Sequence, residues 1–349
     1  MESASDLDRI GGKMSVYLYA GGFKIVKKSG VGQALLHQQE VLDAARIKSD
    51  PHLSSNTKIV HINTVLPDSL LFAVWAKRKG VKVVYYAHST MEDFRYSFRG
   101  SNLFAPLFKK WILFCYNRGD IILTPTEYSR KLLNSYGIRK PIYSISNGID
   151  TKKFCFSQAY RKAFRERYHL KDRDKVVISV GHMIERKGLP DYIALARKMP
   201  DVRFFWFGYT NPSLLPGNMR KAIKNAPANL IFAGYVDQEQ LRYAYSGADV
   251  FAFLSKEETE GIVVLEALAS EIPAVVRDIP VYDDWLVNGR DVYKADTVDE
   301  FARIISEILE KKLPDLSQKG KKIAEERNFL AVGNRLREIY LAEGIRQVM

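Results

Sequence analysis

The chain has 349 residues, of which 46% are hydrophobic, and this is long enough for two domains with cores of ordinary size. Its two cysteines, Cys115 and Cys155, have no CxxC spacing and follow no secretory leader, so we expect a reducing cytoplasm and no structural metal. No apolar stretch reaches the roughly 20 residues that cross a bilayer, which predicts a soluble or peripheral protein.

Positive charge is concentrated in the first part of the chain. The net charge is +13; residues 1–150 carry 21 Lys and Arg against 12 Asp and Glu, whereas residues 151–349 carry 32 against 28. Such a field attracts polyanions, either nucleic acid or an anionic membrane surface. Because the sequence contains no RNA- or DNA-binding motif, we expect contact with the membrane surface and with no nucleic acid.

Strand-like and helix-like runs alternate along the chain, which is typical of parallel sheets with crossover helices. Residues 1–13 are polar and glycine-bearing and suggest a loose leader, with Met14 as an alternative start. The first series of predicted strands covers residues 16–20, 58–61, 82–87, 121–124 and 142–145. Helices are predicted between them at residues 32–45, 69–79 and 126–136. The turn at residues 146–150 then interrupts the pattern.

A second series of predicted strands follows this turn, at residues 175–180, 202–208, 230–233, 250–254 and 274–276. The pattern predicts an α/β fold of two Rossmann-like domains facing each other across a cleft, residues 14–148 and 149–328. Residues 329–349 add a terminal helix, predicted at 332–341. Ligands bind beyond the strand ends of open α/β sheets, so this cleft is the expected site.

Two carboxylates, Glu258 and Glu266, bracket the start of a helix predicted from Ile262. Gly261 opens this helix, and the N–H groups of residues 259–263, including those of Ile262 and Val263, suit a phosphate because they lack partners and carry the positive end of the helix dipole. An anion site between two carboxylates that can accept hydrogen bonds from sugar hydroxyl groups indicates a sugar nucleotide. The alternative is an acidic helix start with a solvated Glu266.

Paired cations, Arg186 and Lys187, occupy the junction between the strand at 175–180 and the next helix. Positive charge is unfavourable at a helix start, because it meets the positive end of the helix dipole. We therefore interpret the two cations as functional residues, and the alternative is an ordinary basic first turn. Two cations there would neutralise a diphosphate and support a leaving group without a metal ion.

Two further features lie where the first domain would face a cleft. In the segment 27–32, Gly30 and Gly32 would let the backbone approach a phosphate, although the GxGxxG fingerprint is incomplete and a plain flexible loop is the alternative. His88 ends the strand at 82–87, which places an imidazole at the cleft edge; the alternative is a structural histidine. His61, at the end of the preceding strand, is the weaker candidate.

The stretch 91–118 suggests an acceptor or membrane surface. Apolar residues at 104, 107, 108, 111 and 115 form a helical stripe suited to a core, while Leu113 falls on the other face with two lysines. A basic amphipathic surface on anionic lipid and an ordinary helix with snorkelling lysines are both open interpretations. The candidate membrane or acceptor residues are Arg95, Arg99, Lys109, Lys110, Trp111 and Leu113.

The Glu258-x7-Glu266 pattern, followed by Ala-Leu-Ala-Ser and by residues 273–278, resembles the sugar-donor signature of the retaining GT-B glycosyltransferases of family four. The resemblance implies that Glu258 contacts the transferred sugar and that Glu266 binds the ribose. It also implies that Lys187 binds the diphosphate and that His88 lies at the acceptor side.

Other implications of this resemblance are a glycine-rich loop that closes over the diphosphate and a terminal helix that packs back on the first domain. Two positions depart from the family pattern. Glu260 stands where many members have an aromatic residue, and His182 stands where the family has an arginine, for which Arg186 is the expected substitute.

Shorter segments extend the resemblance over nearly the whole chain from Met14. They are similar to the enzymes of Gram-positive bacteria that add a second hexose to monoglucosyldiacylglycerol, and lie at residues 28–30, 60–64, 88–90, 92–95, 101–103, 141–143 and 277–282. This implies a metal-independent hexosyltransferase, peripheral at the cytoplasmic face of the membrane, which uses UDP-glucose or UDP-galactose and makes a membrane glycolipid and lipoteichoic acid anchor.

Three alternatives to this hypothesis stay open. The acceptor could be diacylglycerol itself, or a polyprenyl-linked or capsular glycan. In a different class, the chain could be a noncatalytic protein that binds the membrane through its basic surface. The two classes differ in whether Glu258 is needed for activity.

Overall fold

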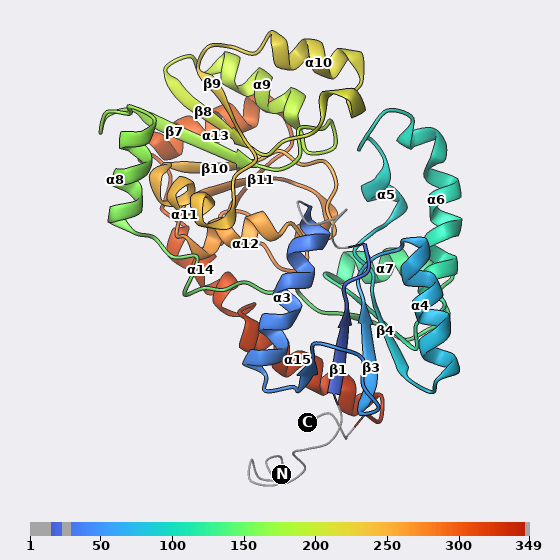
Figure 1. The fold of residues 1–349 in the computed structure, drawn as a ribbon. Coiled ribbons are helices and arrows are strands. Elements are labelled where there is room, and N and C mark those ends of the chain that lie inside the picture. Colours follow the sequence, from blue (N-terminus) through green and yellow to red (C-terminus); the bar gives the residue numbers. More distant parts are fainter. Residues whose placement is uncertain (1–14, 23–28, 346–349) are drawn as a thin grey trace. The chain divides into compact units, whose positions relative to one another are not determined.

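The computed structural model describes residues 15–22 and 29–345, which divide into two compact units. Residues up to Met91, Ala105–Gly148 and the chain from Arg327 form the first unit, and Glu92–Phe104 with Ile149–Glu326 form the second. Each unit contains a six-stranded sheet in which all the strand pairs are parallel (Figure 1). The predicted α/β class with two Rossmann-like sheets is confirmed.

The sheet of the first unit has the strand order β2-β1-β3-β4-β5-β6. Apart from β2, its strands are mainly apolar runs because a parallel sheet is covered on both faces. They are β1 (Ser15–Tyr19), β2 (Ser49–Asp50), β3 (Thr57–Ile62), β4 (Lys82–Tyr86), β5 (Ile121–Thr124) and β6 (Ile142–Ser144). The two-residue β2, which carries no apolar run, is absent from the predicted strands.

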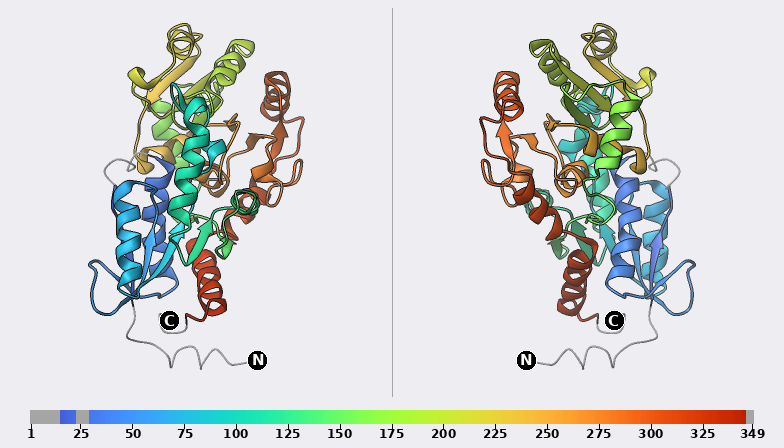
Figure 2. Two further views of the ribbon diagram at one scale, coloured as in Figure 1. Left: turned by 90° about the vertical axis from the view of Figure 1, so that its right-hand side faces the viewer. Right: turned by 90° about the vertical axis from the view of Figure 1, so that its left-hand side faces the viewer.

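Helices cover both faces of this sheet (Figures 1 and 2). On one face, α3 (Gly30–Ala44) and α15 (Phe329–Ala342) pack on strand residues such as Ile59 and Val84. On the other, α4 (Pro67–Arg78), most of α6 (Ser101–Tyr116) and α7 (Glu127–Ser135) pack on the alternate residues, such as Val60 and Val83. The four-residue α5 is Met91–Phe94.

The terminal helix α15 packs closely on α3 within the first unit. Gly333 permits this approach, because a Cβ atom there would lie 2.4 Å from the Cβ of Ala45. Tyr340, on the same helix, hydrogen-bonds the buried His61 of β3 through its hydroxyl. Burial lowers the pKa of His61 to about 3, so this histidine is a neutral core residue.

The sheet of the second unit has the order β12-β11-β10-β7-β8-β9. Its strands are β7 (Lys175–Val180), β8 (Val202–Phe207), β9 (Leu230–Gly234), β10 (Val250–Phe253), β11 (Ala274–Arg277) and β12 (Tyr293–Ala295). Its helices are α8 (Gln158–Arg167), α9 (Leu189–Lys198), α10 (Gly217–Lys224), α11 (Gln238–Gly247), α12 (Ile262–Ala269), α13 (Val298–Leu309) and α14 (Ser317–Glu325).

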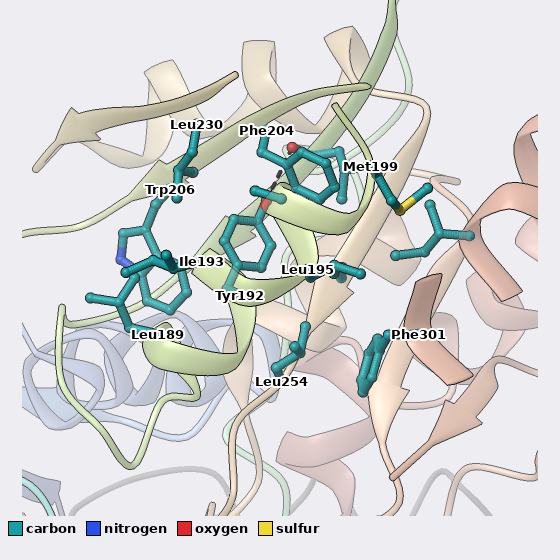
Figure 3. Close-up of a cluster of buried hydrophobic side chains, with 14 of the residues drawn as sticks. Leu189, Tyr192, Ile193, Leu195, Met199, Phe204, Trp206, Leu230, Leu254 and Phe301 are labelled. Carbon is teal, nitrogen blue, oxygen red and sulfur yellow. Dashed lines mark hydrogen bonds between the residues drawn. The ribbon is translucent and has the colours of Figure 1, made fainter. Parts of the chain in front are cut away.

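An aromatic cluster fills one face of this sheet, between the strands and the helices α9 and α13 (Figure 3). Tyr192 packs between Phe204 and Trp206 with edge-to-face geometry, and its hydroxyl donates to the carbonyl oxygens of Val177 and Phe205 at 3.1 and 3.0 Å. Burial of each such ring stabilises the fold by roughly 1.5–3 kcal/mol. The strands are thereby held rigidly beneath the loops that follow them.

The order of strands in the second unit defines a switch point between β7 and β10. The chain proceeds from β7 to β8 and β9 on one side, and then returns to the other side of β7 with β10. Loops that leave two such strands diverge, and ligands bind at their carboxyl ends. In this unit those loops are residues 181–188 and 254–261.

Candidate sugar-donor site

Both switch-point loops end in a glycine that begins a helix. Gly188 precedes α9 with φ of 75°, and Gly261 precedes α12 with φ of 88°, a left-handed conformation that favours glycine. A Cβ atom on Gly188 would lie 2.0 Å from the carbonyl oxygen of Leu254, so the first loop packs directly on the backbone of the second. The two loops therefore form one rigid element.

A buried ion pair joins the two loops. Lys187 Nζ lies 2.5 Å from Oε1 of Glu258, and Ser255 Oγ donates to the same oxygen at 2.6 Å. Glu258 is only 5% exposed. Burial raises the pKa of Glu258, but the charges of Lys187 and Arg186 outweigh it and hold this pKa below its ordinary value. Burial likewise lowers the pKa of Lys187 against the opposing pull of Glu258.

Arg186 lies beside this ion pair but is engaged with other groups. Its Nη1 is 2.8 Å from Asp93 Oδ1 and donates to the carbonyl oxygen of Glu257 at 2.9 Å, and its Nε donates to Ser97 Oγ at 3.1 Å. Oε1 of Glu258 is 4.0 Å from Nη1. The expectation that Arg186 and Lys187 act as a pair on a diphosphate stays a prediction, and Asp93 is a partner that sequence reasoning missed.

Glu266 is buried in α12, which rules out the alternative of a solvated side chain. It is 3% exposed, and its Oε2 accepts a hydrogen bond from the hydroxyl of Tyr245 at 2.9 Å. Burial raises its pKa to about 7, although the Tyr245 hydroxyl and the charge of Lys153 oppose the shift. A buried carboxyl with a pKa near neutrality is a candidate for function.

The start of α12 keeps the properties expected of an anion site. Gly261 provides no side-chain cap, and the N–H groups of Ile262 and Val263 stand at the helix start, where a helix supplies no acceptor of its own. The N–H of Val264 already donates to the carbonyl oxygen of Gly261 at 2.8 Å. A Cβ atom at position 261 would make a tight contact, 3.1 Å from the hydroxyl of Tyr282. The main reason for the glycine is its left-handed backbone conformation.

His182 cannot supply the positive charge that the family arginine would bring to this loop. Its Nδ1 lies 3.1 Å from the carbonyl oxygen of Tyr209, and burial lowers its pKa. Lys187 and Arg186 are therefore the cations of this loop. Among the described residues, no cluster of three or more His, Cys, Asp or Glu side chains could hold a metal ion.

In the first unit, Gly30 lies in a helix that the sequence predicted to begin at Gly32. Helix α3 already begins at Gly30, and both Gly30 and Gly32 lie in its first turn. Ser29 caps the helix by accepting from the N–H of Gly32 at 3.4 Å, and Gly32 is buried. The helix begins two residues earlier than predicted because a serine cap can begin a helix through two glycines when the following face is apolar. The role of Gly30 and Gly32 beside a phosphate stays a prediction. Lys27 and Lys28 lie outside the described residues.

His88 belongs to the first unit and ends a buried polar network. Its Nε2 lies 2.9 Å from Oδ1 of Asn63, and Asn63 Nδ2 donates to Oε1 of Gln38 at 3.0 Å. His88 also stacks on Tyr86, and burial lowers its pKa to about 4. The imidazole is neutral at physiological pH. Sequence reasoning missed Asn63 and Gln38, which are far apart in the chain.

Helix α6 presents a different face from the predicted one. Nε1 of Trp111 donates to the carbonyl oxygen of Val65 at 2.6 Å, and Leu113 packs against the core, so both residues are only partly exposed. Lys109 lies over the ring of Tyr136, with its Nζ 4.1 Å from the centroid. Lys110 is exposed, as are Arg95 and Arg99 of the second unit.

The exposed apolar residues of α6 are Leu103, Phe104, Leu107 and Phe114, at 79%, 54%, 65% and 47% exposure. The predicted core stripe was therefore wrong at residues 104 and 107. Almost every position of this helix is apolar, so periodicity alone could not select the buried face. None of the described helices is both long enough and apolar enough to cross a membrane.

Comparison with known proteins places the chain in a family. Residues 161–327 match the model of glycosyl transferases group 1, and residues 44–153 match that of Glycosyltransferase Family 4. The chain is 40% identical over 328 residues to the processive diacylglycerol alpha-glucosyltransferase of Acholeplasma laidlawii, covering 94% of this chain and 98% of the relative. The chain belongs to the family 4 glycosyltransferases.

Other relatives agree with this placement. The family 4 chain is 28% identical to the alpha-galactosylglucosyldiacylglycerol synthase of Streptococcus pneumoniae, over 79% of this chain and 75% of the relative. The crystal structure of Anabaena HepE in complex with UDP and glucose superimposes with a TM-score of 0.74 at 16% identity, over 95% of this chain and all of that one. The fold is GT-B, and the protein is a hexosyltransferase enzyme, as its sequence predicted.

Proposed function

We propose that this glycosyltransferase moves a hexose, preferably glucose, from a UDP-sugar to monoglucosyldiacylglycerol, with retention of configuration and without a metal ion. The buried Lys187–Glu258 ion pair at the switch point carries the proposal for the sugar donor. The acceptor is supported by the 40% identity to a diacylglycerol glucosyltransferase over nearly the full length of both chains. The diglycosyl product would serve as membrane glycolipid and lipoteichoic acid anchor.

Lys187 and the two carboxylates each have a role in this proposal. Lys187 stabilises the charge that develops on the departing UDP, and the N–H groups of Ile262 and Val263 bind a phosphate oxygen. Glu258 accepts hydrogen bonds from the transferred sugar, and Glu266 from the ribose. The Lys187–Glu258 contact holds both side chains in place before the sugar donor binds.

Transfer on one face of the donor sugar needs no protein nucleophile. The leaving phosphate of UDP accepts the proton of the incoming acceptor hydroxyl as the new glycosidic bond forms and the bond to UDP breaks. In the first unit, His88 would contribute a neutral hydrogen-bonding group to the reacting region, since its pKa of about 4 keeps it uncharged.

We further propose that the enzyme is peripheral at the cytoplasmic face of the membrane. The exposed Leu107, Lys110 and Phe114 follow one another along α6 at helical spacing, so they lie on one face. Apolar side chains beside a lysine suit the surface of an anionic bilayer. Arg95 and Arg99 are exposed in the second unit and would add charge.

A direct assay tests the acceptor and the sugar together. Purified protein in anionic mixed micelles is given labelled UDP-glucose or UDP-galactose, with diacylglycerol and monoglucosyldiacylglycerol in separate reactions, and the lipid products are resolved. The proposal requires a diglycosyl lipid from the monoglucosyl acceptor. If UDP binds but neither sugar labels either lipid, the lipid acceptor is wrong. The Glu258→Gln variant is the control, because a noncatalytic surface-binding protein would not depend on this carboxylate.

A second candidate is processive transfer that begins on diacylglycerol. The activity of the 40% identical Acholeplasma relative, a processive diacylglycerol alpha-glucosyltransferase, favours it. In the same assay, the diacylglycerol reaction would then yield mono- and diglucosyl lipids in succession. Absence of labelled product from diacylglycerol, with product from the monoglucosyl lipid, excludes this candidate.

A further inference from the structure

The short segment Glu92–Phe104 belongs to the second unit, although the chain on both sides of it belongs to the first. The chain therefore leaves the first unit and returns to it within 13 residues. Ordering these residues against the second unit costs conformational entropy, and a short connection within the first unit would not need it. The segment's attachment to the second unit therefore requires an explanation in specific contacts.

Arg186 supplies three of these contacts. Its Nη1 pairs with Asp93 at 2.8 Å, its Nε donates to Ser97 Oγ at 3.1 Å, and its backbone N–H donates to the carbonyl oxygen of Tyr96 at 3.3 Å. Tyr96 has a φ of 55°, and its own N–H donates to Oδ1 of Asn102 at 2.9 Å. A non-glycine residue in this region is strained, so the surrounding contacts must hold it there.

The same arginine is built into the loop that carries Glu258. Nη1 donates to the carbonyl oxygen of Glu257 at 2.9 Å, and the carbonyl oxygen of Arg186 accepts from the N–H of Lys256 at 2.8 Å. Ser255 Oγ, which binds Glu258, also lies 3.3 Å from the Arg186 carbonyl oxygen. One residue, 8% exposed, thus fastens the segment to the loop of the Lys187–Glu258 pair.

The fastened segment presents aromatic and basic side chains to solvent. Tyr96 and Phe98 are 53% and 41% exposed, and Phe94 packs edge-to-face on Phe98 with centroids 5.0 Å apart. Arg95 and Arg99 are exposed in the same segment. Aromatic rings with one wet edge suit a ligand that is part sugar and part lipid.

We propose that Glu92–Phe104 is an acceptor-binding element and that Arg186 is the positioning residue that sets it beside the sugar-donor site. The acceptor class, a glycolipid, rests on the proposed function; the positioning role does not. Arg186 acts through Asp93, Ser97 and the Tyr96 backbone, and a lysine cannot replace it, because one ammonium cannot reach the same partners in the same plane.

Hydrogen–deuterium exchange of the full chain tests the positioning role without any lipid. Asp93→Ala and Arg186→Lys should each speed amide exchange in residues 92–104 about tenfold or more, with little change in the strands of either sheet. The matched control is Asp191→Ala, because Asp191 pairs with Arg277 at 2.6 Å and has the same 26% side-chain exposure as Asp93. Exchange in residues 92–104 that is equal in the wild type and both variants overturns the positioning role.

Kinetics of the same variants test the acceptor role. The acceptor KM should rise about tenfold to a hundredfold in Asp93→Ala and Arg186→Lys, while the Kd for UDP in Asp93→Ala stays within about threefold. The double variant Asp93→Ala/Arg186→Lys should be no worse than Arg186→Lys alone, because the two residues act as one pair.

The outcomes separate the two levels of inference. A rise in the UDP Kd of Asp93→Ala as large as the rise in acceptor KM overturns the acceptor role. If the wild type labels no lipid, the proposed function fails, while the exchange experiment still decides whether Arg186 positions the segment.

Discussion

The two buried polar clusters of this enzyme differ in charge. In the second unit, Lys187, Glu258 and Arg186 are paired ions at the ends of β7 and β10. In the first unit, His88, Asn63 and Gln38 form a neutral network. Burying ions costs free energy unless they are paired, so we expect buried ions at places where the protein binds a charged ligand. The charged cluster suits an anionic sugar donor, and the neutral cluster suits an uncharged hydroxyl acceptor.

Removal of Lys187 should have the largest effect. Lys187→Ala leaves the buried Glu258 without its main partner, which should lower the free energy of unfolding by about 3–5 kcal/mol. It should also reduce kcat by about 10²–10³-fold, because one charged group that stabilises the leaving diphosphate is lost. Thermal unfolding and initial rates measure the two effects.

The double variant Lys187→Ala/Glu258→Ala separates stability from catalysis in this cluster. It should recover much of the lost stability, because no unpaired charge stays buried, while its activity stays low. Recovery of both stability and activity would show that the ion pair is only a structural feature of the loops.

Glu266 tests whether a buried carboxyl near neutrality belongs with the charged cluster. Its pKa is about 7 when folded, above the ordinary 4.5, so the stability it confers is full below pH 4.5 and falls as pH rises through 7. The loss amounts to about 3 kcal/mol above pH 8. Glu266→Gln mimics the protonated form and should unfold at a higher temperature than the wild type at pH 8, but not at pH 4.5.

The same titration should affect binding of the sugar donor. An ionised Glu266 accepts stronger hydrogen bonds from ribose hydroxyls than a protonated one, so the KM for UDP-hexose should fall as pH rises through 7 in the wild type. In Glu266→Gln this KM should be independent of pH over the same interval, about tenfold above the wild-type value at pH 8 and close to it at pH 6. A wild-type KM that is flat between pH 6 and 8 would contradict the ribose assignment.

The two clusters also differ in how far the sequence predicted them. Continuous apolar runs located β5 and β7 to the residue, and the mismatch of cations with a helix start indicated Arg186 and Lys187. The partners of these residues were not predictable. Asp93 and Asn63 are ordinary polar residues in the chain, and only the packing of distant strands and loops brings them to Arg186 and His88.

The errors have the same origin. The helix predicted from Gly32 begins at Gly30, because the Ser29 cap and the buried face of the helix outweigh the poor helix propensity of glycine. In α6, Phe104 was placed in the core stripe but is exposed, whereas Trp111, in the same stripe and also a membrane candidate, packs on the core. An indole N–H needs an acceptor when it turns inward, and the carbonyl oxygen of Val65, 46 residues away in sequence, provides one.

His88 should respond more weakly than the charged cluster. Because its pKa is about 4, a histidine limb near pH 6.5 should be missing from the pH profile of kcat/KM. His88→Gln can still donate a hydrogen bond to Asn63 and should stay within about threefold of wild-type activity, whereas His88→Ala should lose about tenfold. A loss of about 10² or more in the glutamine variant would instead indicate proton transfer by the imidazole.

The smallest effect on the fold should come from the exposed face of α6. Leu107→Ser and Phe114→Ser replace side chains that are 65% and 47% exposed, so each should change the free energy of unfolding by less than about 0.5 kcal/mol. Each should nevertheless weaken binding to anionic vesicles several-fold, with the loss reduced in uncharged vesicles, because insertion and attraction act together.

Trp111→Ala on the other face of α6 is the matched control. It removes a ring packed on the core and its hydrogen bond to Val65, which should cost about 3–5 kcal/mol of stability. Variants that still fold should bind vesicles as the wild type does. If vesicle binding follows Trp111 rather than Leu107 and Phe114, the membrane surface lies elsewhere, and α6 is an ordinary helix covering the sheet.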